Sequence, residues 1–129
     1  MNEVKLDNIF PPSGISNKDW CACITNKIGM FTLEYYKDKL DPTISYSNGG
    51  HINIYWNPRK NSCVGTCRRI PRIIAYNESK INDMNKANVL HVVVHECAHL
   101  IYDGHGKEFS NIEDFIFDKC IENLEKNKF

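Results

Sequence analysis

The segment from Val89 to Ile101 constrains the fold most, because it is apolar on almost all sides when it is drawn as a helix. A helix of this kind is normally buried in the core of a protein. Three polar residues, His95, Glu96 and His99, interrupt it. Burying such side chains is unfavourable unless they are paired or bound to a metal ion. The segment therefore predicts a central helix, running from about Asn82 to Tyr102, that carries a functional site.

The spacing of the polar residues predicts a metal centre. His95 and His99 are four residues apart, so one face of the helix presents both imidazoles. Glu96 projects beside the pair, where a carboxylate can act as general base on a metal-bound water. His105 follows between two glycines, and Gly104 is expected to adopt a positive φ that turns His105 back beneath the metal. Three histidines and one water predict an open, catalytic site for one Zn²⁺ per chain.

Other interpretations of the same residues remain open. Glu113, on the following helix, is an alternative third ligand that would leave His105 as a bystander. The histidines are otherwise core residues whose ring nitrogens bond to backbone carbonyls. Tyr76 and Tyr102 are both candidates to stabilise an oxyanion beside the metal, and the sequence does not choose between them.

These side chains favour peptide-bond hydrolysis as the reaction, with a protein or peptide as the substrate. One alternative is a non-catalytic module that uses zinc for stability while it binds DNA or a protein partner. A second alternative is a zinc hydrolase that acts on another kind of bond.

Helix and strand patterns in the rest of the chain predict an α+β fold. Ser16 can cap a helix from Asn17 towards Leu40, although Gly29 interrupts its apolar pattern. Alternating or β-branched segments predict a small antiparallel sheet packed on the central helix. The strands are expected over residues 52–56, 63–69 and 72–76, with a further short strand over residues 44–46. Ser110 and Glu113 are interpreted as a capping box for a final amphipathic helix.

Length and composition place this fold in one domain. The chain has 129 residues, which predicts a single domain over residues 1–129, with residues 1–14 as an N-terminal arm. No stretch approaches the roughly 18 consecutive apolar residues that span a bilayer, and the N-terminus lacks an apolar signal segment. We therefore expect an intracellular protein, cytoplasmic or nuclear, with no membrane partner. The 6 cysteines are expected to be reduced thiols.

Positive charge is concentrated on the segment that is expected to form a hairpin. The residues concerned are Arg59, Lys60, Arg68, Arg69 and Arg72. Such a patch can bind DNA phosphates or an acidic stretch of a protein substrate. A solvated hairpin that is balanced by the acidic C-terminal helix explains the charge equally well, because the formal net charge of the chain is +0. Tyr55 and Trp56 alternate, so one should face the core while the other is free to stack on a base.

The segment from His95 to Phe109, H-E-C-A-H-L-I-Y-D-G-H-G-K-E-F, resembles the SprT-like metallopeptidases, which include the DNA–protein crosslink protease Spartan. Its HGxxF ending is similar to the SprT-like signature, and the short gap before His105 is closer to the related WLM and YgjP-like peptidases. The stretch from Trp56 to Ile74 is similar to the strand-turn-strand segment that precedes the SprT helix.

The resemblance implies a minimal zincin fold, in which a small sheet and two supporting helices surround the HExxH helix. It implies that His95, His99 and His105 bind zinc and that Glu96 is the base. It also suggests a role in DNA–protein crosslink repair. Many SprT-like proteins continue into a cysteine-rich zinc ribbon, which has no counterpart in this sequence.

Overall fold

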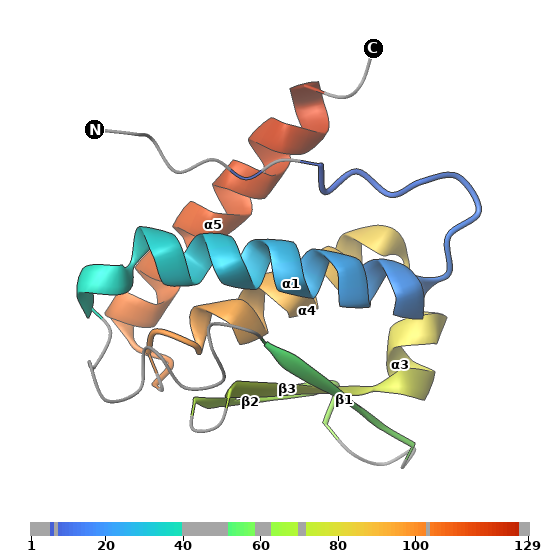
Figure 1. Ribbon diagram of the computed structural model, residues 1–129, viewed down its shortest axis with the longest axis horizontal. Helices are drawn as coiled ribbons and strands as arrows, with labels where there is room; N and C mark the ends of the chain where they lie inside the picture. Colours follow the sequence, from blue (N-terminus) through green and yellow to red (C-terminus); the bar gives the residue numbers. More distant parts are fainter. Residues whose placement is uncertain are drawn as a thin grey trace.

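The computed structural model describes residue 6 and residues 8–39, 52–58, 63–69, 72–102 and 104–126. Within them the fold is α+β, as predicted (Figure 1). The elements in chain order are helix α1 (Asn17–Tyr35), the 3-10 turn η1 (Lys37–Lys39), strands β1 (Asn53–Asn57), β2 (Gly65–Arg69) and β3 (Arg72–Asn77), and helices α3 (Glu78–Asp83), α4 (Lys86–Ala98) and α5 (Lys107–Lys126). The strand predicted over residues 44–46 lies outside the described residues.

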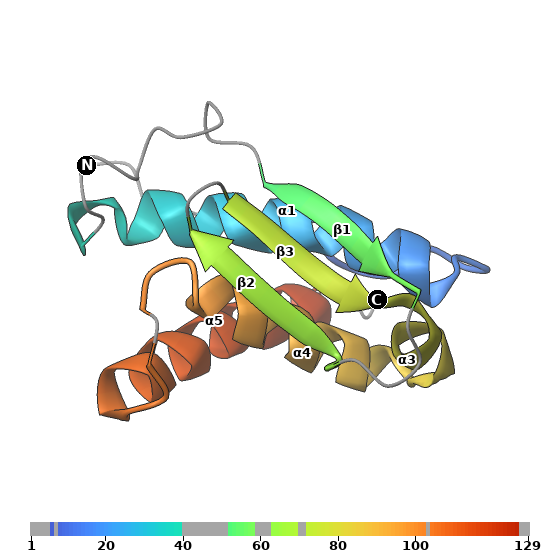
Figure 2. The ribbon, with the colours of Figure 1, turned by 90° about the horizontal axis from the view of Figure 1, so that it is seen from below.

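The sheet and the helices form layers around α4. Figure 2 shows the three strands lying across α1 and α4, and α5 packs against α4. The core between these layers is made of apolar side chains from all of them. Fully buried examples are Ile24 and Ile28 of α1, Ile74 of β3, Val89, Val93 and Val94 of α4, and Ile116 of α5. The central position of α4 confirms what its apolar sequence predicts.

Helix α1 begins where the sequence predicts and ends earlier. The Ser16 hydroxyl accepts a hydrogen bond from the backbone N–H of Asp19 at 3.1 Å, which is the expected cap. The helix ends at Tyr35 instead of continuing towards residue 40. Gly29 lies inside the helix and does not break it. The side chain of Ile52 packs where a Cβ at position 29 would stand. The glycine in mid-helix therefore permits close contact between α1 and Ile52, the residue before β1.

The sheet is mixed, so the prediction of an antiparallel sheet is wrong for one of its two pairings. The strand order is β1-β3-β2, with β1 parallel to β3 and β2 antiparallel to β3. Ile74, at the middle of β3, pairs with Ile54 on one side and Cys67 on the other. β3 is the most deeply buried strand, which explains why the last strand of the sequence takes the central place.

The predicted central helix is divided into two. α3 ends at Asp83, Met84 is extended, and the Asn85 side chain caps α4 by accepting from the N–H of Asn88 at 2.8 Å. An amide side chain at this position can satisfy an N–H group that the helix leaves open, so a new helix starts there. At the other end α4 stops at Ala98, and His99 is its C-cap residue.

The last helix begins earlier than predicted, and its capping box is wrong. α5 starts at Lys107, so Ser110 and Glu113 lie inside it. The N–H of Ser110 already donates to the carbonyl of Gly106 at 3.0 Å. The Glu113 side chain is consequently available for a contact outside its own helix. Across the described residues, no helix is long and apolar enough to cross a membrane.

Candidate metal centre

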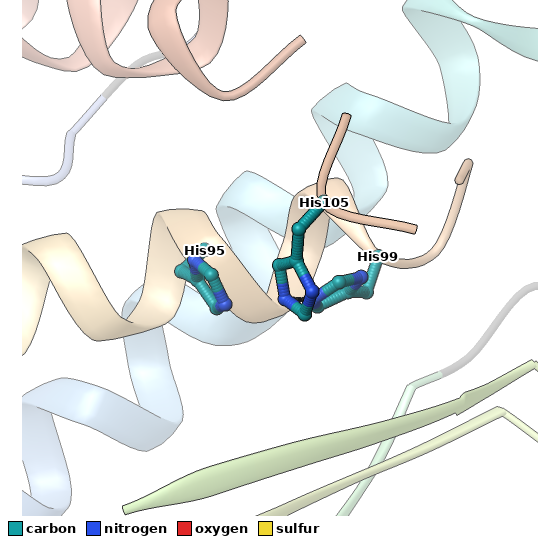
Figure 3. A group of neighbouring side chains, drawn as sticks. All are labelled: His95, His99 and His105. Atoms are coloured by element: carbon teal, nitrogen blue, oxygen red, sulfur yellow. Dashed lines mark hydrogen bonds between the residues drawn. The ribbon is translucent and has the colours of Figure 1, made fainter. Parts of the chain in front are cut away.

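Three histidines meet beside the C-terminal end of α4. Their candidate ligand atoms all lie within 4.8 Å of one another. His95 comes from the last turn of α4, His99 from its C-cap, and His105 from the loop before α5, and the three rings converge in Figure 3. Nε2 of His99 is 3.0 Å from Nε2 of His105. Two nitrogens that bind the same zinc ion, each at about 2.0–2.1 Å, are roughly 3.3 Å apart, so this spacing suits a shared metal.

Two of the imidazoles are held through their other nitrogen. Nδ1 of His95 is 2.7 Å from Oε2 of Glu113, and Nδ1 of His99 is 3.0 Å from the backbone carbonyl oxygen of Tyr102. When each Nδ1–H donates to its oxygen, Nε2 keeps the lone pair that a metal needs. The carbonyl contact foreseen for a core histidine thus exists at His99, whose Nε2 lies beside Nε2 of His105. The structure places Glu113 behind His95 and brings His105 into the group instead.

Phe109 contacts all three rings. It is buried, and its ring centroid lies 5.0 Å from that of His95, 4.4 Å from His99 and 5.2 Å from His105. The positive φ predicted for Gly104 is wrong, since Gly14 is the glycine with positive φ among the described residues. A Cβ at position 104 would instead lie 3.2 Å from the Tyr102 ring. Glycine there makes room for that ring rather than for an unusual backbone.

Glu96 is buried beside the histidines, with 5% of its surface exposed. Burial raises the pKa of its carboxyl, His95 opposes this shift, and Glu113 adds to it. Among the described residues, none forms a hydrogen bond or ion pair with the Glu96 carboxylate. In the part of the chain that the structure describes, every fully buried side-chain oxygen or nitrogen has a hydrogen-bond partner, so the unbonded Glu96 oxygens keep contact with solvent although the residue as a whole is buried. A carboxyl in such a position is a candidate for proton transfer.

A profile of the SprT-like family matches residues 32–126, which include the whole of this centre. The chain belongs to the SprT-like family. Neither the curated proteins nor the solved structures contain a significant match to it. The family match and the three converging histidines agree with a metal-binding protein whose sequence features are peptidase-like.

The two tyrosines considered for oxyanion stabilisation lie in different environments in this SprT-like protein. Tyr76 is only 1% exposed, and its hydroxyl is 2.8 Å from Oγ1 of Thr25 in the core between β3 and α1. Burial raises its pKa well above the usual range. Tyr102 is 38% exposed and lies three residues after His99, in the turn that follows α4. The structure therefore places Tyr102, and not Tyr76, at the surface next to the histidines.

The predicted basic patch is only partly present on the surface of the SprT-like protein. Arg68 is exposed, and it lines a hollow on the outer face of the sheet together with Tyr55, which is 56% exposed. Arg72 does not belong to this surface, since only 2% of it is exposed. The correction follows from the central position of β3, whose side chains are covered by the neighbouring strands and helices. Arg59, Lys60 and the side chain of Arg69 lie outside the described residues.

Two contacts at the centre of the SprT-like protein escape sequence reasoning. One is the support of His95 by Glu113, which lies 18 positions later in the chain. The other is the approach of the Glu96 side chain to Gly65 at the start of β2. The available signals were a carboxylate on the helix that follows the histidines and a glycine inside a predicted strand. Neither signal identifies its partner before the tertiary structure is known.

Proposed function

We propose that this protein is a zinc-dependent metalloendopeptidase. The observation that carries the proposal is the convergence of His95, His99 and His105 within 4.8 Å, next to the buried Glu96. Three histidine nitrogens are a common ligand set for catalytic zinc, which keeps a further position open for water. The Nδ1 contacts of two of the rings support the fit, because they leave Nε2 ready to bind a metal.

The proposed chemistry places the proton transfers on Glu96. A zinc ion, when bound, lowers the pKa of a ligated water to about 7 and polarises a carbonyl oxygen. The Glu96 carboxylate accepts a proton from the attacking water and then returns it to the nitrogen of the leaving amine. Its raised pKa suits this exchange, because a protonated carboxyl is easier to form at neutral pH. Glu113 keeps the His95 ring in one orientation throughout.

The test compares two variants in a zinc assay and in a casein cleavage assay. Glu96→Gln should bind zinc with unchanged stoichiometry while cleavage falls by about a hundredfold or more. His99→Ala should lose zinc and cleavage together. Wild-type cleavage rates in Glu96→Gln would refute the mechanism. Tightly bound zinc with no cleavage of any substrate, with or without DNA, would favour the non-catalytic module.

We propose DNA as a partner, bound at the outer face of the sheet. No Asp or Glu occurs in the sequence between Asp41 and Glu78, so the sheet segment carries only positive charge. Arg68 and the exposed ring of Tyr55 line one hollow on that face. A positive groove with an aromatic ring suits a single strand, whose phosphates and bases it can hold together.

Binding of a fluorescent single-stranded oligonucleotide, measured at two salt concentrations, tests this partner. Arg68→Glu should weaken binding and reduce its salt dependence, whereas Tyr55→Ala should cost about 1–3 kcal/mol. Lys37→Glu is the control, since Lys37 is exposed on η1. Equal binding by wild type and Arg68→Glu would show that DNA does not bind at this face. The acidic stretch of a protein substrate would then be the alternative ligand.

A further inference from the structure

The side chain of Glu96 fills space that any residue other than glycine would need at position 65. A Cβ built on Gly65 would lie 3.0 Å from both Cγ and Oε2 of Glu96, and 3.2 Å from its Cδ. Such distances are shorter than ordinary van der Waals contacts between carbon atoms, which are about 3.5–4.0 Å. The first residue of β2 and the buried carboxylate of α4 are therefore in direct contact.

The backbone at position 65 does not itself require glycine. Gly65 is in a strand, where it pairs with Tyr76 of β3, and the positive φ found among the described glycines belongs to Gly14. Glycine weakens a strand, and β-branched or aromatic residues fit this position better. A glycine that is unfavourable for its own strand points to its neighbour as the reason for its presence.

Packing against this strand is also one restraint on the carboxylate. Glu96 is almost fully buried, and no described residue gives its carboxylate a hydrogen bond or an ion pair. Its position then depends on the atoms packed around it. The backbone of β2 at Gly65 is one such surface.

We propose that Gly65 is a positioning residue, which leaves room for Glu96 to lie between β2 and the three histidines. This proposal rests on the proposed function, in which Glu96 transfers protons. A methyl group at position 65 moves the carboxylate by a few tenths of an ångström, and a larger side chain moves it further. Displacements of about 1 Å at a reacting group reduce rates by about a hundredfold.

The kinetic test uses Gly65→Ala and Gly65→Val. We expect kcat to fall by about tenfold for alanine and by about a hundredfold for valine, with KM and zinc content unchanged. Thr66→Ala is the matched control, because Thr66 is the next residue of the strand and its side chain is exposed, so we expect its kcat to equal that of the wild type. Wild-type kcat in both Gly65 variants would overturn the proposal. If the wild type cleaves nothing, the proposed function fails instead.

A second measurement does not depend on activity. Thermal unfolding of Gly65→Ala, Glu96→Ala and the double variant gives the coupling between the two positions. The change in Tm caused by Gly65→Ala should be more favourable by about 3 °C in the Glu96→Ala background than in the wild-type background, because the contact is gone. Additive shifts in Tm would overturn the proposed contact. Coupling in Tm together with an unchanged kcat would overturn the positioning role.

Discussion

Two buried polar side chains close to the same sheet differ in how their polar atoms are satisfied. Tyr76 of β3 is linked to Thr25, which donates to the carbonyl oxygen of Cys21 at 2.6 Å. Because Thr25 has a single hydroxyl proton, the Tyr76 hydroxyl is the donor in their contact. Glu96 of α4 is also buried, but no described residue bonds to its carboxylate.

This difference in hydrogen bonding distinguishes a side chain that stabilises the fold from one that is a candidate for chemistry. A buried polar group with its hydrogen bonds made contributes to stability, whereas one without them needs another explanation. The Tyr76 hydroxyl donates to Thr25, which donates to the carbonyl oxygen of Cys21, and these hydrogen bonds join β3 to α1. The Glu96 oxygens have no hydrogen-bond partner among the described residues and keep contact with solvent. The sequence made Tyr76 a site candidate because it could not show that the Tyr76 hydroxyl forms a hydrogen bond with Thr25.

Loss of a ligand should have the largest effect. We expect His105→Ala to reduce zinc affinity by more than about a hundredfold, because it removes one of three ligands. His91→Ala is the control, since His91 is exposed and its ring packs on Phe117 at 5.5 Å. Competition with a coloured chelator measures both. Unchanged affinity in His105→Ala would return Glu113 to consideration as the third ligand.

Removing the support of a ligand should have a smaller effect. Glu113→Gln loses the negative acceptor of His95, so zinc affinity should fall by about 10–100-fold while the stoichiometry stays the same. Asp114→Asn removes a charge from the neighbouring exposed position and should leave the affinity unchanged. If the two variants behave alike, the 2.7 Å contact between Glu113 and His95 does not influence the metal.

Gly29 offers a contrast with Gly65, since its neighbour is apolar. Gly29→Ala collides with Ile52, so the free energy of unfolding should fall by about 1–3 kcal/mol, while kcat per folded molecule is unchanged. Urea denaturation measures the loss. Adding Ile52→Ala to Gly29→Ala should relieve the collision, and a fully additive double variant would show that the two residues are not in contact.

The smallest effects should separate the two tyrosines. Tyr76→Phe removes one buried hydrogen bond and should lower the free energy of unfolding by about 1 kcal/mol without changing kcat. Tyr102→Phe should leave stability unchanged and lower kcat if its hydroxyl meets an oxyanion. Urea denaturation and steady-state kinetics on both variants give the answer. A fall in kcat for Tyr76→Phe would show that the Tyr76 hydroxyl influences the site although it is hydrogen-bonded to Thr25.

Much of the site could be predicted because its signals are local. The spacing of His95 and His99, the glutamate between them and the histidine after the helix all follow from helix periodicity and short sequence distance. The cap at Ser16 and the three strands are local in the same sense. Errors came where a pattern continued past a break, as at Asn85, which caps a helix of its own.

The remaining features depend on residues far apart in the chain. Strand pairing decides that β3 is central, which buries Arg72 and removes it from the basic patch. The packing of α5 on α4 decides that Glu113 supports His95 instead of capping its own helix. No periodicity within one segment contains this information, because it is set by which faces the elements bury against one another.

By itself, the sequence identified the residues of the candidate metal centre. An apolar helix with His95, Glu96 and His99 at one turn's spacing allows few explanations other than a metal centre. Only the tertiary structure decided how these side chains are held in place, through Glu113 behind His95 and Gly65 against the Glu96 carboxylate. The reason is physical: ligand type and spacing are local properties, whereas orientation depends on contacts that exist only after α5 and β2 have packed around α4.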